Sequence, residues 1–296
     1  MKEIAILGAT ASGKTNLAIE VAIKVGANIL SLDSLSIYKE VDIVSAKPTI
    51  YERRGVRHFG IDEIYIDKYF SAVTFFELYK KAKEVSKKEG KHLIIVGGTS
   101  FYLKSMINGL SIKLPLSLET KEKVAKILLD LPQAYKNILK LDPIYANKIS
   151  INDKYRVEKW YEIYYESGEI VTEYFSKNQK EAIIKNIPIF DILLDKETLR
   201  ENIKLRTTQM IDSGLIDEIF SLEKKYTRIW TPMRAIGIKE TLEFLDGKID
   251  KKELHNLICI HTSQLAKRQE TFNKSQFPNR IKLIKKDLTK TITSQF

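Results

Sequence analysis

The sequence predicts an α/β fold in which helices flank a parallel sheet and an all-helical domain interrupts the chain. Short apolar runs rich in β-branched residues alternate with stretches of helical periodicity, which is typical of a parallel sheet. These runs lie at 3–7, 27–32, 92–96 and 187–194. From about 113 to 184 such runs are absent and helix-capping residues are frequent. We therefore expect a discontinuous core, 1–112 and 185–296, and a helical insertion domain, 113–184.

In the first third of the chain, local signals place the ends of the expected elements. The first apolar run stops at Gly8, and helical periodicity follows it. A Thr-Phe-Phe-Glu sequence that begins at Thr74 fits a capping box, which predicts the start of a helix there. This helix should run towards Glu89, because Gly90 is a typical helix end.

Capping residues also mark helices in the insertion and in the last third. Asp142 precedes a proline and Asp153 precedes a helical stretch, so both are expected to cap helix N-termini. Gly168 is expected to end a helix. After the last apolar run, a further helix should extend to Ser213 and close at Gly214.

Composition narrows the class of protein. A chain of 296 residues with 44% hydrophobic content can bury a substantial core. Cys259 is its only cysteine, which excludes an internal disulfide and a multi-cysteine zinc site and fits a cytoplasmic location. No apolar run approaches the length of a membrane span, so no membrane partner is expected. The net charge of +11 fits either a polyanionic ligand or a solvated charged surface, and the net charge alone does not choose between them.

The strongest motif is G-x-x-x-x-G-K-[ST], placed directly after the first apolar run and before a helix. Such a loop turns its backbone N–H groups towards phosphate oxygens, with the helix N-terminus adding positive charge. Lys14 should neutralise the terminal phosphate, and Thr15 should hold Mg²⁺ as the metal cofactor. The motif makes the expected core P-loop NTPase-like. Its residues are Gly8, Ala9, Thr10, Ala11, Ser12, Gly13, Lys14 and Thr15.

The acidic residue that an NTP hydrolase usually carries is missing after the run at 92–96, which continues into Gly97 and Gly98. This favours either a small-molecule kinase or an enzyme for which a diphosphate is the leaving group. Asp33 follows the second run, at the sheet edge where such folds build their sites, so it is the best-placed carboxylate. Capping a short helix near Ser34 is its alternative role.

Several segments, in their order along the chain, resemble the tRNA dimethylallyltransferases, also called tRNA isopentenyltransferases. The phosphate loop is followed by Asp-Ser at 33–34, Ala-Lys-Pro at 46–48 and Gly-Gly-Thr at 97–99. Asn-Asp at 152–153, Ile-Gly at 236–237 and Ala-Lys-Arg-Gln at 266–269 come later. The resemblance covers nearly the whole chain.

The resemblance implies transfer of a dimethylallyl group from dimethylallyl diphosphate to the N6 amine of the adenine 3′ of the anticodon in tRNAs that read codons beginning with U. Pyrophosphate would leave. Asp33 would be the base that takes the amine proton, Arg206 would face the diphosphate, and Thr99 would contact the tRNA near the reacting groups. Without the resemblance, Arg206 would be interpreted as a solvated helix arginine and Thr99 as a helix N-cap.

The resemblance also implies a surface for the tRNA anticodon stem-loop. The residues concerned are Asp33, Ser34, Leu35, Ser36, Thr99, Lys121, Lys123, Arg156, Lys159, Gln264, Lys267 and Arg268. The segment 261–290 carries a net charge of +6. Such a run is usually a solvated helix face, but this one overlaps the Ala-Lys-Arg-Gln segment and so suits phosphate contacts. Trp160, Tyr161, Tyr164 and Tyr165 recur at helical spacing and are expected to belong to the helical core.

The chain departs from the family pattern at several positions, including Ala9, Val44-Ser45 and Ser263, where Pro, Gly-Thr and Arg are usual. None of these departures falls on Lys14, Thr15, Asp33 or Arg206, so we expect an active enzyme, acting as a monomer. A P-loop kinase for a nucleoside or small metabolite is the alternative, and an RNA-binding protein with an inactive loop is a third possibility.

Overall fold

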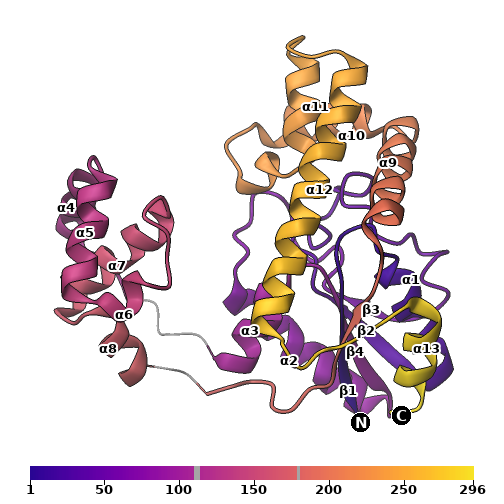
Figure 1. Ribbon diagram of the computed structural model, residues 1–296. Coiled ribbons are helices and arrows are strands. Elements are labelled where there is room, and N and C mark those ends of the chain that lie inside the picture. Colours follow the sequence, from indigo (N-terminus) through magenta and orange to yellow (C-terminus); the bar gives the residue numbers. More distant parts are fainter. Residues whose placement is uncertain (110–113, 179–180) are drawn as a thin grey trace. The chain divides into compact units, whose positions relative to one another are not determined.

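The structure, a computed structural model, describes residues 1–109, 114–178 and 181–296. It divides into two compact units (Figure 1). Unit 1 comprises Met1–Ser105 and Ile184–Phe296, and unit 2 comprises Met106–Ile183. The expected boundary between 112 and 113 lies outside the described residues. The expected boundary between 184 and 185 lies one residue from the observed division.

Unit 1 is built on a six-stranded sheet of order β3-β2-β4-β1-β5-β6. Every strand pair is parallel, as the alternating pattern predicts. The strands are β1 (Glu3–Leu7), β2 (Ala27–Ser31), β3 (His58–Phe59), β4 (His92–Gly97), β5 (Ile189–Ile192) and β6 (Ile281–Leu283). The four predicted strands are confirmed. β3 and β6 were not predicted because two and three residues are too short to show a periodicity.

Helices cover both the sheet and its carboxyl edge. They are α1 (Lys14–Val25), α2 (Ala72–Lys88), α3 (Ser100–Asn108), α9 (Lys196–Asp212), α10 (Leu215–Tyr226), the 3₁₀ helix η1 (Thr231–Arg234), α11 (Ile238–Leu245), α12 (Lys251–Gln276) and α13 (Lys285–Thr293). One core cluster joins α1 and α13 to the strands. A second cluster joins α10, α11 and α12 to the segment after β2. In Figure 1, α9, α10, α11 and α12 stand together beyond the end of the sheet that carries the phosphate loop.

The start of α2 differs from the expected one. Ser71, not Thr74, is its N-cap, and the Ser71 hydroxyl accepts the backbone N–H of Thr74 at 3.3 Å. Thr74 therefore lies at the third helical position. A hydroxyl N-cap can stabilise a helix that starts after either Ser71 or Thr74. The earlier start is observed, and it adds about one helical turn.

Unit 2 contains only helices among its described residues. They are α4 (Leu118–Ile127), α5 (Leu131–Leu141), α6 (Pro143–Ala146), α7 (Lys154–Ser167) and α8 (Val171–Lys177). Asp142 and Asp153 cap α6 and α7, and Gly168 ends α7 at a φ of 74°, as predicted. The aromatic residues of α7 form the core of the unit, since Trp160 is fully buried and stacks on Tyr164. Their assignment to the core is confirmed.

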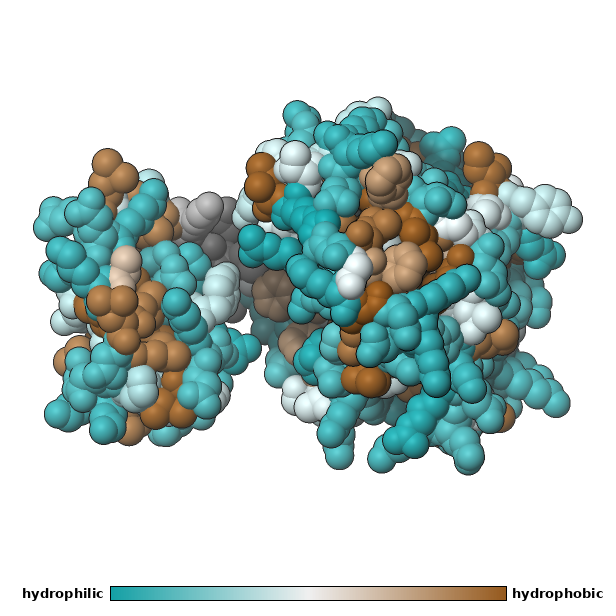
Figure 2. Space-filling model, turned by 90° about the horizontal axis from the view of Figure 1, so that it is seen from above, coloured by the Kyte–Doolittle hydropathy of each residue, from teal (hydrophilic) through white to brown (hydrophobic). Residues whose placement is uncertain are grey.

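The surface is mostly hydrophilic on the face shown in Figure 2, with separate apolar areas on each unit. Large apolar side chains are exposed on α9, α10 and α12, at Leu205, Phe220 and Ile260. Within the described part of the chain, no helix combines the length and the apolar character that a membrane span requires.

Candidate functional site

The phosphate loop joins β1 to α1 and adopts a cradle conformation. Gly13 is the N-cap of α1 in the left-handed region, at a φ of 80°, where a side chain would be strained. A Cβ on Gly8 would lie 2.8 Å from the Ser12 hydroxyl, so the loop also needs glycine there. The Lys14 ammonium donates to the carbonyl of Ala9 at 3.1 Å. The loop therefore holds its lysine folded back over the cradle.

Two adjoining pockets open at this loop. The first, the polar pocket, takes in the phosphate loop and the ends of β2 and β4. Its polar lining residues include Lys14, Thr15, Ser31, Ser36, Lys47 and His58. The second, the apolar pocket, lies among α9, α10 and α12. Its apolar lining residues include Leu35, Val44, Ile203, Met210, Leu215, Ile236, Ile258 and Leu265.

Four residues line both pockets: Thr10, Asp33, Ser45 and Arg206. A carboxylate and a guanidinium thus lie where the polar pocket meets the apolar pocket. This arrangement suits a substrate with a charged end and a hydrocarbon end, with chemistry at their junction.

Asp33 uses its two oxygens differently. Oδ1 accepts the backbone N–H groups of Leu35, at 2.8 Å, and Ser36, at 3.2 Å. The segment after it forms turns rather than the short helix considered above. Oδ2 has no hydrogen-bond partner among the described residues. The turn fixes the carboxylate while one oxygen stays available to a ligand, so the structural and chemical roles can coexist.

Arg206 lies against the phosphate loop. One of its terminal nitrogens donates to the Thr10 hydroxyl and the other to the Ser45 carbonyl, both at 3.4 Å. Its neighbours Arg200 and Lys204 are exposed, whereas burial lowers the pKa of Arg206. The interpretation of Arg206 as an ordinary solvated helix arginine is therefore wrong.

The site concentrates positive charge that is not fully balanced. Burial lowers the pKa of Lys14 to about 8, an effect that nearby Asp33 and Asp191 oppose and nearby Arg206 reinforces. A multiply charged anion between the two cations would relieve their repulsion and favour both charged forms. The electrostatics suit a ligand that carries several negative charges.

Two residues at the loop escaped the sequence prediction. The Gln269 side chain accepts the backbone N–H of Thr10 at 2.8 Å and donates to the carbonyl of Gly98 at 3.1 Å. A Cβ on Gly98 would lie 2.3 Å from the Gln269 amide nitrogen, so that glycine makes room for the contact. Gln269 belongs to the Ala-Lys-Arg-Gln segment named above, and it lies three residues after the buried Ala266, so helical spacing also indicated its position.

Asp191 is the second missed residue. It lies in β5 opposite Leu7, fully buried, and burial raises its pKa. Its Oδ2 pairs with Arg280 at 2.6 Å. A single aspartate inside an apolar strand forms no sequence motif. Its position beside the phosphate loop follows only from the pairing of β5 with β1.

This pairing corrects the interpretation of the basic segment 261–290. Arg280, with a side chain only 8% exposed, also pairs with Glu270, at 3.1 Å. Lys282 shares Glu270 at 2.6 Å, and Lys285 pairs with Glu20 at 3.0 Å. Part of the local positive charge therefore stabilises unit 1 internally, and the expectation that the whole segment suits RNA phosphates is wrong for Arg280.

The other predicted RNA contacts of unit 1 lie near the site. Ser34, Gln264, Lys267 and Arg268 are exposed, and Ser36 lines the polar pocket. Thr99 precedes α3, and its backbone N–H donates to the carbonyl of Leu32 at 3.1 Å. The residues that line the two pockets do not include Thr99.

The four predicted contacts in the insertion belong to unit 2. Arg156 pairs with Asp153 at 3.0 Å, and Lys159 pairs with Glu162. Lys123 lies over the ring of Tyr165, 3.9 Å from its centre. Lys121 is exposed beside α7, where Glu158 and Glu162 line the same hollow.

Sequence comparison relates the chain to known proteins along its whole length. The family described as IPP transferase matches residues 36–276. The tRNA dimethylallyltransferase of Aliarcobacter butzleri is 54% identical over 296 residues, covering 100% of this chain and 99% of the relative. That of Sulfurimonas denitrificans is 51% identical over 277 residues, covering 94% and 93%.

Solved structures agree with the sequence relatives. A tRNA delta(2)-isopentenylpyrophosphate transferase from Staphylococcus epidermidis matches with a TM-score of 0.70 and 29% identity, covering 100% of this chain and 98% of that chain. A eukaryotic dimethylallyltransferase acting on tRNA matches with a TM-score of 0.80 and 28% identity, covering 98% and 75%. On its motifs, its fold and these relationships, the chain belongs to the IPP transferase family.

Proposed function

We propose that this enzyme transfers a dimethylallyl group from dimethylallyl diphosphate to N6 of the adenine 3′ of the anticodon, in tRNAs that read codons beginning with U. The products are N6-(dimethylallyl)adenosine and pyrophosphate. The position of Asp33 and Arg206 at the junction of a polar and an apolar pocket is the observation that carries the proposal. Family membership favours this transfer over the kinase alternative.

The chain's residues would divide the work of the transfer as follows. As the allylic C–O bond breaks, its electron pair goes to the diphosphate, and Lys14, Arg206 and the loop N–H groups stabilise the added charge. The N6 lone pair of adenine forms the new C–N bond. N6 loses one proton, for which Oδ2 of Asp33 is the acceptor at the junction of the pockets.

A magnesium ion fits the donors present. Thr15 offers a hydroxyl to the polar pocket, and Mg²⁺ typically takes one or two protein oxygens together with phosphate oxygens and waters. When bound, the ion would neutralise charge on the leaving diphosphate.

The tRNA would lie against residues near the site of unit 1 and against the basic residues of unit 2. Gln264, Lys267 and Arg268 on α12, together with Ser34, Leu35 and Ser36, are the proposed contacts in unit 1. Lys121, Lys123, Arg156 and Lys159 are those in unit 2. The adenine must leave the anticodon-loop stack to reach Asp33. We further infer that the enzyme is a cytoplasmic monomer.

A labelled-substrate assay tests the function. Purified protein with Mg²⁺, radiolabelled dimethylallyl diphosphate and unmodified tRNA should give label in the tRNA, and nucleoside analysis should recover the prenylated adenosine. A second reaction contains labelled ATP and a mixture of nucleosides. Phosphorylation of a nucleoside without transfer to tRNA would establish the kinase alternative. Binding of tRNA with neither reaction would favour an RNA-binding protein that has lost catalysis.

A further inference from the structure

The segment 41–47, here called the 41–47 loop, lies along both pockets. Val44 lines the apolar pocket, Lys47 lines the polar pocket, and Ser45 lines both. Ala46 has a φ of 44°, a backbone conformation that is uncommon for residues other than glycine. A loop in such a conformation persists only when its surroundings hold it.

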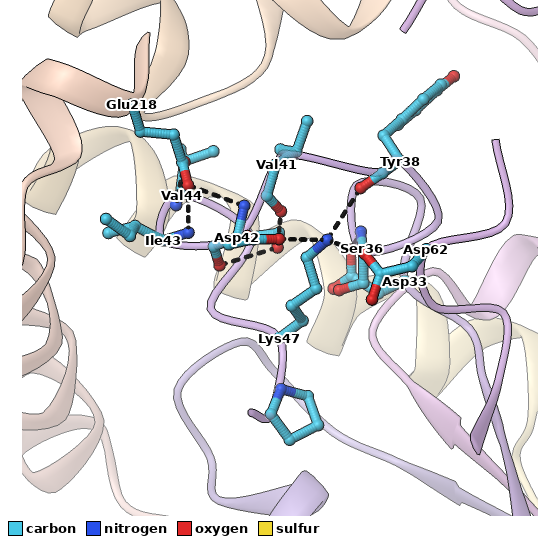
Figure 3. A network of polar contacts seen from close by, with 12 residues as sticks. Asp33, Ser36, Tyr38, Val41, Asp42, Ile43, Val44, Lys47, Asp62 and Glu218 are labelled. Carbon is cyan, nitrogen blue, oxygen red and sulfur yellow. Dashed lines mark hydrogen bonds and ion pairs between the residues drawn. The ribbon is translucent and has the colours of Figure 1, made fainter. Parts of the chain in front are cut away.

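Glu218 of α10 holds this loop by its backbone (Figure 3). One carboxylate oxygen accepts the N–H groups of Asp42 and Ile43, at 2.9 and 2.7 Å, and the other accepts the N–H of Val44 at 3.0 Å. Successive backbone N–H groups that converge in this way form an anion-binding concavity. Here the concavity is filled by a side chain of the same protein.

The loop is also fastened from within. The ammonium of Lys47, whose side chain is 4% exposed, donates to the carbonyl of Tyr38 at 2.9 Å and pairs with Asp42 at 2.7 Å and with Asp62. Lys47 itself lines the polar pocket, so its replacement would change the pocket directly. Glu218 lines neither pocket, and its side chain reaches them through its hydrogen bonds to the loop.

The loop in turn contacts the predicted diphosphate-binding arginine. The Ser45 carbonyl accepts a hydrogen bond from Arg206 at 3.4 Å. Arg206 lies on α9, and α10 follows after Ser213 and Gly214. Glu218 on α10 therefore holds the loop whose Ser45 carbonyl contacts Arg206 on the adjoining helix α9.

We propose that Glu218 is a positioning residue for Arg206. By holding the three N–H groups of the 41–47 loop, it places the Ser45 carbonyl so that the guanidinium is directed at the diphosphate. The proposal rests on the proposed function for the identity of the diphosphate substrate. Its direct test requires only inorganic pyrophosphate, so it can succeed or fail independently of prenyl transfer.

The first measurement is calorimetric binding of pyrophosphate, with Mg²⁺, to the full chain. Glu218→Gln keeps the size of the side chain but replaces one acceptor oxygen with an NH₂ group that cannot accept a backbone N–H. We expect pyrophosphate to bind about tenfold more weakly, as for the loss of one charge-assisted hydrogen bond. Asp217→Asn, the adjacent exposed carboxylate on the same helix, removes the same charge and should bind as the wild type does.

A double-mutant cycle separates positioning from general loosening of the fold. If Glu218 acts through Arg206, the Glu218→Gln change should weaken binding in the wild type but have less than a twofold effect in an Arg206→Ala background. Equal weakening in both backgrounds would overturn the proposal, as would wild-type affinity in Glu218→Gln. Glu218→Asp, which retains the charge on a shorter side chain, enters the same cycle if the glutamine variant fails to fold.

Transfer kinetics give a second readout. Glu218→Gln should raise KM for dimethylallyl diphosphate while leaving tRNA affinity unchanged, because the proposed effect is confined to the Arg206 side of the site. A fall in tRNA affinity of the same size would indicate a general structural role and contradict the proposal. If the wild type binds pyrophosphate but transfers no prenyl group, the proposed function fails while the binding cycle still decides the role of Glu218.

Discussion

The side-chain oxygen of Gln269 accepts the backbone N–H of Thr10 at 2.8 Å, which joins α12 to the phosphate loop across 259 residues of sequence. The amide of the same side chain donates to Gly98. One glutamine therefore connects the loop after β1, the loop after β4 and the helix that carries Lys267 and Arg268. The phosphate cradle and the proposed RNA surface share this contact.

Replacement of Gln269 should weaken the diphosphate site. Gln269→Ala removes both hydrogen bonds, and we expect about tenfold weaker pyrophosphate binding in calorimetry. Gln269→Glu retains an acceptor for Thr10 but places a carboxylate against the Gly98 carbonyl, so it should also bind more weakly. Gln209→Ala, an exposed glutamine on α9, is the matched control. Unchanged affinity in Gln269→Ala would show that the loop keeps its conformation without this contact.

Asp33 offers a conservative test of the proposed base. Asp33→Asn retains an oxygen for the N–H groups of Leu35 and Ser36 but cannot take a proton at neutral pH. We expect kcat to fall by a factor of about 10² to 10⁴, the usual contribution of a general base, with tRNA affinity within a few-fold of wild type. Asp33→Ala should lose transfer as well and also loosen the turn. Near-normal single-turnover rates in the asparagine variant would exclude the role as base.

The lowered pKa of Lys14 predicts that pyrophosphate binding depends on pH. Its pKa of about 8 means that the ammonium is present below this pH and is lost above it in the unliganded protein. Since the anion prefers the charged form, affinity for pyrophosphate should fall as the pH rises above about 8, by at most tenfold per pH unit. Lys14→Met corrects for ionisation of the ligand itself. If its binding shows the same pH profile as the wild type, Lys14 is not the group responsible.

The buried pair of Arg280 and Asp191 should be important for stability. Arg280→Met leaves the Asp191 carboxylate buried without its partner, and we expect a loss of about 3 to 5 kcal/mol in the free energy of unfolding by urea. Lys285→Met breaks a pair that is exposed on both sides and should cost less than about 1 kcal/mol. Asp191→Leu combined with Arg280→Met should recover much of the loss. Equal losses of unfolding free energy in Arg280→Met and Lys285→Met would contradict this ranking.

Salt dependence tests which basic residues meet RNA. The affinity for tRNA should fall steeply with salt, and removal of a phosphate contact should reduce the slope of log affinity against log salt by about 1. We expect this change for Lys267→Ala and Arg268→Ala. Lys282→Met should leave the slope unaltered, because Lys282 is paired with Glu270. Binding that does not respond to salt would remove the phosphate-contact role from α12.

Much of the fold could be predicted because its signals are local. The phosphate loop, the four longer strands and the caps at Asp142, Asp153 and Gly168 each depend on a few adjacent residues. The site was predicted less completely. Lys14, Thr15 and Asp33 follow strand ends, so topology alone brings them together, whereas the place of Arg206 rested on the family resemblance.

The residues that escaped prediction act across distant segments. Gln269, Asp191 and Glu218 each contact a part of the chain far from them in sequence, and their types have commoner explanations on a helix or in a strand. For the basic segment 261–290 the error is different, because positive charge was assigned to RNA although part of it is paired within the protein. Its charges are local and visible, but their partners Asp191, Glu270 and Glu20 are found only in the folded chain.

The division of unit 1 by unit 2 has a consequence for how the protein is made. The phosphate loop is synthesised before unit 2, whereas β5, β6 and Gln269, which complete the sheet or hold the loop, are synthesised after unit 2. Contacts between such distant segments form slowly because a long loop must first be closed. We expect unit 2 to fold during synthesis, and the cradle to gain affinity for phosphate only when the last strands join the sheet.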